Sequence, residues 1–123
     1  MKFVYTPQDG FYAARKNGVK IVSDIEPDEQ CEAVAELLAE GYAAAFPRIC
    51  EYIFSNADFS TRKDESDPNI PENLKLDFIR IFSDGSTELW YLFRKPFEGR
   101  QVEFCVDVGF TGVFEEFTEI FID

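Results

Sequence analysis

The sequence contains no histidine, and this absence excludes several kinds of chemistry. Serine–histidine and cysteine–histidine nucleophilic sites both need an imidazole, and so do zinc sites that mix cysteine with histidine. The three cysteines form no C-x-x-C pair and are too few for a four-cysteine zinc site. Glycine-rich phosphate-binding motifs are also missing. We therefore expect a protein that is not an enzyme and that holds no metal and no cofactor.

Long apolar runs are missing as well. None approaches the roughly 20 residues of a membrane-spanning helix, and the first ten residues lack the apolar core of a secretory signal. Without an export signal, Cys31, Cys50 and Cys105 are expected to stay reduced and to pack as small apolar side chains. The 123 residues, 46% of them apolar, suit a single domain, 1–123. We expect a cytoplasmic protein that does not bind membranes.

Positive charge is scarce. Lysine and arginine together number 12 against 24 aspartates and glutamates, so the net charge is −12 at pH 7. A nucleic-acid backbone or an anionic membrane would repel such a protein. Two stretches contain acids and no base: residues 21–47, between Lys20 and Arg48, and residues 101–123. These stretches point to a basic partner, whereas the plainer interpretation is that the charge only keeps the protein in solution.

Two turn signals divide the first quarter of the chain. Asp9-Gly10 and Asn17-Gly18 are strong hairpin signals because these residue types tolerate positive φ. They separate short apolar segments at residues 3–5, 11–15 and 19–25. The pattern predicts a three-stranded meander.

The next segment has a helical period. Pro27 stands at the expected first helical position, and the acids after it suit the positive end of the helix dipole. Gly41 is expected to end this helix, and a second helix is expected from Ala43, with Pro47 in its first turn. The pattern predicts a helical hairpin, with a single kinked helix as the alternative. Apolar stripes are formed by Cys31, Val34, Leu37 and Leu38 in the first helix and by Phe46, Ile49, Cys50 and Ile53 in the second.

One side of the first expected helix carries a row of glutamates spaced three or four residues apart: Glu29, Glu32, Glu36 and Glu40. We call these four residues the glutamate ridge. At about 100° per residue they lie opposite the apolar stripe. Like charges at this spacing repel and cost a helix a few tenths of a kcal/mol per pair. The ridge is therefore our candidate for contact with lysine or arginine side chains of a partner.

The last part of the chain predicts four antiparallel strands, at residues 74–82, 87–93, 101–108 and 113–122. The fold class is α+β: an N-terminal β-meander, a helical hairpin and a C-terminal four-stranded antiparallel meander. Residues 89–93 are apolar on both faces and residues 78–82, which include Arg80, nearly so, and such strands are usually covered on both faces. The helices can cover one face. The N-terminal meander or a second copy of the chain can cover the other, so the protein is expected to be a monomer or a homodimer.

Residues 60–73 are polar, contain Pro68 and Pro71, and are expected to form a surface connection. The cluster Asp64-Glu65-Ser66-Asp67 lies within this connection. It lacks the spacing of a calcium-binding loop, so we interpret it as a solvated charge cluster.

Part of the β region resembles a known pattern. The residues are Asp84-Gly85, then Glu88-Leu89-Trp90-Tyr91, then Phe97-Glu98-Gly99. This order resembles small uncharacterised bacterial domains of the toxin-immunity type. Arg100 and Asp123 stand where that pattern commonly has a histidine and a glycine, so no role of that histidine is carried over. The resemblance implies a cytosolic binding protein without catalytic residues.

These observations lead to one hypothesis and two rivals. The hypothesis is a non-catalytic acidic binding protein, an immunity-type inhibitor whose glutamate ridge occludes a basic protein such as a toxin enzyme. The first rival is a small-molecule-binding or carboxylate-dependent enzyme domain in the β half, which an aromatic pocket with a buried Asp or Glu would favour. The second is a nucleic-acid mimic, which needs two rows of carboxylates where the sequence supplies one.

Overall fold

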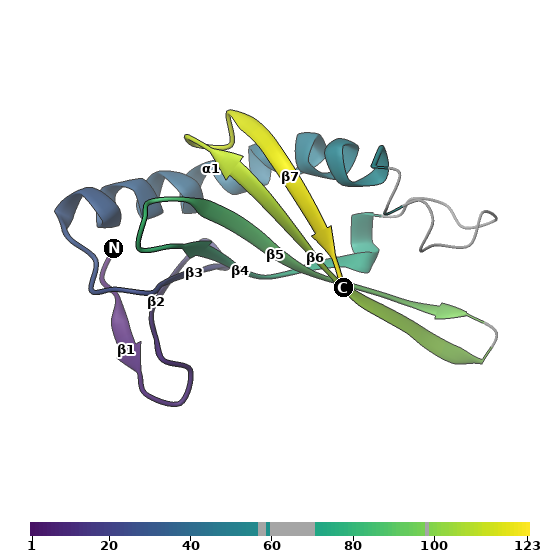
Figure 1. Cartoon of the computed structure of the whole chain (residues 1–123), viewed down its shortest axis with the longest axis horizontal. Coiled ribbons are helices and arrows are strands. Elements are labelled where there is room, and N and C mark those ends of the chain that lie inside the picture. Colours follow the sequence, from purple (N-terminus) through teal and green to yellow (C-terminus); the bar gives the residue numbers. More distant parts are fainter. Residues whose placement is uncertain (57–58, 60–70, 98) are drawn as a thin grey trace.

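The computed structural model describes residues 1–56, 59, 71–97 and 99–123 (Figure 1). In this part of the chain, one long helix lies across one side of a seven-stranded sheet. The strands follow the sheet in sequence order, and the α+β class, the three N-terminal strands and the four antiparallel C-terminal strands are confirmed. The elements are β1 (Val4–Thr6), β2 (Phe11–Lys16), β3 (Val19–Ser23), α1 (Glu29–Phe54), the 3-10 turn η1 (Pro71–Asn73), β4 (Leu74–Ile81), β5 (Thr87–Phe97), β6 (Arg100–Thr111) and β7 (Glu116–Ile122).

The sheet is mixed because of one pair of strands. β3 and β4 pair in parallel, with Ile21 opposite Ile79, and every other neighbouring pair is antiparallel. Parallel neighbours need a crossover connection, which α1 provides. At the β2–β3 turn, Asn17 and Gly18 both have positive φ, 54° and 76°, which suits a tight hairpin turn.

The expected helical hairpin is wrong: α1 is a single helix of 26 residues. Gly41 does not end it. A Cβ atom at Gly41 would lie 3.6 Å from Val113, in ordinary contact with the β6–β7 turn. Pro47 lies inside the helix at an exposed position. It has no N–H to offer the carbonyl of Ala43, but Ala43 is also exposed, so water can hydrate that carbonyl. Burial of the apolar stripe on the sheet stabilises the helix through both residues.

The N-terminal meander does not cover the second face of the sheet, so the first of the two alternatives for covering that face is wrong. It extends the sheet sideways, because β3 bonds to the edge of β4. Among the described residues, a helix lies on only one face, and we call the opposite face the open face (Figure 1). The strand registers place on it Val22, Phe78, Arg80, Trp90, Leu92, Cys105, Asp107 and Phe121.

The core lies between α1 and the covered face of the sheet. Its fully buried side chains include Leu38, Ile49 and Ile53 from the helix and Ile79 and Leu89 from the strands. The interior also holds one polar pair. The hydroxyls of Tyr42 and Tyr91 lie 2.6 Å apart, and burial raises the pKa of Tyr42 to about 12, so both phenols stay neutral.

Two predictions concern residues that the structure does not describe. Most of the surface connection at 60–73 and the whole cluster Asp64-Glu65-Ser66-Asp67 lie outside the described residues. In the described part of the chain, no helix combines the length and the apolar content needed to cross a membrane.

Candidate functional site

The C-terminal half of the glutamate ridge is engaged within the chain. Lys16, on β2, donates from Nζ to Glu36 Oε1 at 2.5 Å and to Glu40 Oε1 at 2.9 Å. The N-terminal amine of Met1 lies 3.4 Å from Glu36 Oε2. Hydrogen bonding between Lys16 and Glu36 raises the pKa of the lysine and lowers that of the glutamate. Two of the four carboxylates of the glutamate ridge, those of Glu36 and Glu40, therefore already pair with a cation of this chain.

The first turn of α1 has no such compensation. Asp28 is the N-cap residue, and its Oδ1 atom accepts the N–H of Cys31 at 2.7 Å. Glu26 precedes it, and Glu29 and Glu32 follow. None of these four carboxylates forms an ion pair with another residue that the structure describes. The uncompensated charge thus lies at the start of α1.

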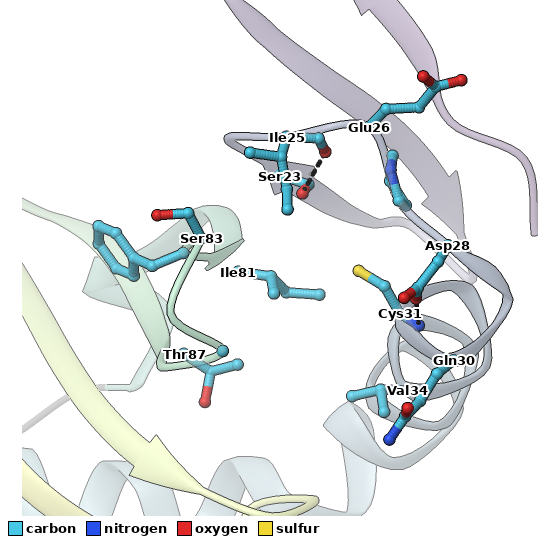
Figure 2. Close-up of a pocket in the computed structure, with 13 residues that line it drawn as sticks. Ser23, Ile25, Glu26, Asp28, Gln30, Cys31, Val34, Ile81, Ser83 and Thr87 are labelled. Carbon is cyan, nitrogen blue, oxygen red and sulfur yellow. Dashed lines mark hydrogen bonds between the residues drawn. The ribbon is translucent and has the colours of Figure 1, made fainter.

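A hollow of about 310 Å³ opens beside this turn (Figure 2). It lies where the carboxyl ends of the parallel strands β3 and β4 meet the start of α1. In Figure 2, Cys31, Val34 and Ile81 point into the hollow, whereas the carboxylate of Glu26 points away from it. The apolar part of its wall is formed by Ile25, Pro27, Val34, Ile81 and Phe82.

Two polar groups that line this hollow, the hydroxyl of Ser23 and the thiol of Cys31, are already bonded or neutral. Ser23 is buried, and its Oγ atom donates to the carbonyl of Ile25 at 2.7 Å. Burial, and then the charge of Asp28, raises the pKa of the Cys31 thiol. A protonated thiol is a poor nucleophile, so the hollow is better suited to an apolar side chain than to covalent chemistry.

A second hollow, of about 480 Å³, adjoins the first, and Val34, Gly85 and Thr87 line both. The acids of the two linings are Glu26, Asp28, Glu88, Glu115 and Glu119. We call the two hollows with these five acids the acidic groove. Among the described residues, no lysine or arginine lines either hollow.

The far wall of the acidic groove is the β6–β7 turn, which is fixed to α1. Phe114 is buried and has a positive φ of 56°, a conformation that a bulky residue adopts only when its surroundings impose it. Its ring lies 4.9 Å from that of Phe110 and 6.2 Å from that of Tyr42. Arg48, on α1, donates from Nη2 to the carbonyl oxygen of Phe114. The wall is therefore held in place by packing and by this bond.

The open face carries an arginine that its neighbours satisfy. Arg80 Nε lies 3.0 Å from Asp24 Oδ1. The guanidinium lies 4.9 Å from the ring centre of Phe11, 4.3 Å from that of Phe82 and 5.5 Å from that of Trp90. Such cation–π contacts explain how a charged residue sits among aromatic rings. The guanidinium of Arg80 is therefore already held by its own neighbours.

One carboxylate on the open face lacks a partner. Asp107 is half-buried, and its Oδ1 atom is buried with no hydrogen bond to any described residue. Burial first, and then the charges of Glu88 and Asp123, raise its pKa to about 6. A hollow of about 480 Å³, which Trp90 also lines, lies over it.

The sequence analysis identified the helix that carries the ridge but missed the acidic groove. Its acids come from the start of α1, from β5 and from the β6–β7 region, and no pattern along the chain links them. Cys50 is buried as expected and Cys31 is half-buried against the core, whereas Cys105 is exposed on the open face, which corrects the prediction for Cys105. No group of three metal-binding side chains occurs among the described residues.

Comparisons were made with protein-family models, with curated proteins and with solved structures, and none of them gave a match for this chain.

Proposed function

We propose that this protein is a non-catalytic acidic binding protein, an immunity-type inhibitor that occludes a basic protein partner. The observation that carries the proposal is the acidic groove. Five acidic residues line two adjoining hollows, with the carboxylate of Glu26 directed outward, and the described residues of the linings include no lysine or arginine. A surface of one charge sign around an apolar floor attracts a partner of opposite sign and gives it a place to bury apolar side chains.

The groove offers both features that a protein interface needs, apolar surface and charge. Ile25, 54% exposed, and Val113, 37% exposed, lie on its lining and supply apolar surface. The first hollow, at about 310 Å³, has room for one large apolar side chain of a partner. The carboxylates around it steer lysine and arginine side chains during approach and raise the association rate.

Only the N-terminal half of the glutamate ridge contributes strongly to this proposed surface. Glu29 and Glu32 lie in the first turn of α1 together with Asp28 of the groove, so they extend the same negative surface. Glu36 and Glu40 must give up their hydrogen bonds with Lys16 before they can contact a partner, and this loss reduces the binding free energy that they contribute. We therefore expect reversal of Glu29 and Glu32 to lysine to slow association more than reversal of Glu36 and Glu40.

The experiment begins with capture of partners from a lysate of the source organism on the immobilised full chain, at low salt. Each captured protein is then purified and its association rate is measured by surface plasmon resonance. Two double variants are compared with the wild type: Glu26→Lys/Glu115→Lys, in the groove, and Asp9→Lys/Glu72→Lys, at exposed positions outside it. Both variants change the net charge by the same amount, so the second one controls for general electrostatics.

We expect a basic partner whose association rate falls about tenfold or more for the groove variant and much less for the control variant. The difference should shrink as salt is added, because screening removes it. An equal loss in both variants would show that only net charge matters and would overturn the groove. A specific partner that is itself acidic would overturn the proposed function.

A second candidate function is the binding of a small molecule at Asp107, and the unpartnered Oδ1 atom beside Trp90 favours it. A ligand cation over the ring of Trp90 would supply the missing partner for that carboxylate. A thermal-shift screen of small organic amines against the wild type and Asp107→Asn tests this function. Stabilisation of the wild type alone supports it, and equal shifts for both proteins refute it.

A further inference from the structure

The two edges of the sheet differ in how well they are protected. β1 and β7 are the edge strands. β1 is only three residues long and is followed by Pro7, and short strands and prolines are common devices against unwanted strand pairing. β7 is seven residues long and contains no proline, lysine or arginine. Among the described residues no strand pairs with its outer side, so β7 is the edge that can accept an added strand.

The hydrogen bonds to β6 show which backbone groups of β7 point outward. Cys105 and Asp123 exchange both backbone bonds, at 3.2 and 3.0 Å. Pairs alternate in an antiparallel ladder, so Phe121 and Glu119, opposite Asp107 and Gly109, also bond toward β6. The alternate residues, Ile120 and Ile122, therefore direct their N–H and C=O groups away from β6, to the free edge.

The side chains of β7 define what could pair with it. Glu119, Phe121 and Asp123 lie on the open face, and Phe121 is 53% exposed. Ile120 and Ile122 lie on the covered face and pack against the core. An added strand would meet acids on one face and apolar side chains on the other, so it should alternate basic and apolar residues. A second copy of this chain does not fit, because the charged residues of β7 are all acidic and would repel their equivalents.

We propose that β7 accepts an extended basic segment of the protein partner as an additional strand of the sheet. The inference rests on the proposed function and names the way in which the partner docks. Main-chain bonds at Ile120 and Ile122 supply binding that does not depend on side chains, and Glu119 and Asp123 select lysine or arginine at alternate positions. The acidic groove, which includes Glu119, continues the same negative surface.

The test uses a synthetic peptide of alternating lysine and valine as the probe and the isotope-labelled full chain. Hydrogen exchange of each backbone amide is followed by NMR with and without the peptide. We expect the amides of Ile120 and Ile122 to exchange rapidly in the free protein and to become protected at least about tenfold in the complex. The amides of Phe121 and Glu119 should be protected in both states.

Two control peptides separate strand pairing from charge attraction. One has the same sequence with all its backbone nitrogens methylated, so it keeps the charge and has no backbone N–H to donate to β7. The other has glutamate in place of lysine. Neither should protect Ile120 or Ile122. The variant Glu119→Lys should weaken binding of the lysine peptide about tenfold, whereas Glu72→Lys, at an exposed site away from β7, should not.

The failure of this inference can be told apart from failure of the proposed function. Equal binding of the lysine peptide and its methylated form, or binding without protection of Ile120 and Ile122, would overturn strand addition. So would no binding at millimolar peptide concentration. Any of these results leaves the groove to be judged by the captured partner and the variant Glu26→Lys/Glu115→Lys. Loss of discrimination in that experiment would overturn the groove, and a specific partner that is itself acidic would overturn the proposed function.

Discussion

The substitution Asp107→Asn should stabilise the protein near neutral pH and have little effect in mild acid. In the native state the pKa of Asp107 is about 6, above its ordinary value of 3.8, chiefly because the carboxylate is partly buried. The folded protein therefore binds a proton more tightly than the unfolded chain does. Stability associated with this group is highest below pH 4 and falls as the pH rises from about 4 to about 6.

The size of the effect follows from the same values. The two pKa values differ by about two, and each tenfold change in proton affinity corresponds to about 1.4 kcal/mol. The destabilisation caused by ionised Asp107 at pH 7 therefore has an upper bound near 3 kcal/mol. Asp107 is only half-buried, so water screens much of this penalty. We expect a gain of about 1 kcal/mol for Asp107→Asn at pH 7.

Urea unfolding of the wild type and Asp107→Asn at pH 7 and pH 4 measures this gain. Glu116→Gln is the control, because it removes one negative charge at an exposed position of β7. Its effect on the free energy of unfolding measures how much a lower net charge stabilises the protein in general. The gain from Asp107→Asn beyond the control should be present at pH 7 and absent at pH 4. The same gain at both pH values, or none at pH 7, would refute the argument from burial.

Other predictions concern the helix and its contact with the sheet. Pro47→Ala should raise the free energy of unfolding by about 1–3 kcal/mol, because it restores a helical hydrogen bond to the carbonyl of Ala43; no gain in thermal unfolding would argue against a continuous helix. Gly41→Ala should add about 0.5–1 kcal/mol, because the new methyl group finds ordinary contact with Val113. Tyr91→Phe should cost about 1–3 kcal/mol by leaving the hydroxyl of Tyr42 without its partner, and a neutral result in urea unfolding would contradict that pairing.

Local signals predicted much of the secondary structure. Asn17 and Gly18 form their turn with positive φ because few other residues adopt that conformation without strain. The start of α1 was predicted only approximately: Pro27 was expected at the first helical position, whereas Asp28 caps the helix and Glu29 begins it. Asp28 takes the cap because its carboxylate can reach the N–H of a residue three positions along the chain. In each of these places the determining contact lies within a few residues of sequence, so a pattern along the chain contains the answer.

Other features depended on residues that are distant in sequence. Gly41 and Pro47 are ordinary stop signals, yet α1 continues through them because burial on the sheet outweighs local preference. The sequence alone determined an acidic α+β chain, its strands and the helix that carries the glutamate ridge. Only the tertiary structure decided that Lys16 engages Glu36 and Glu40, that the N-terminal meander joins the sheet, and that five scattered acids line one groove, because each of these results from pairing across the sheet or packing against it.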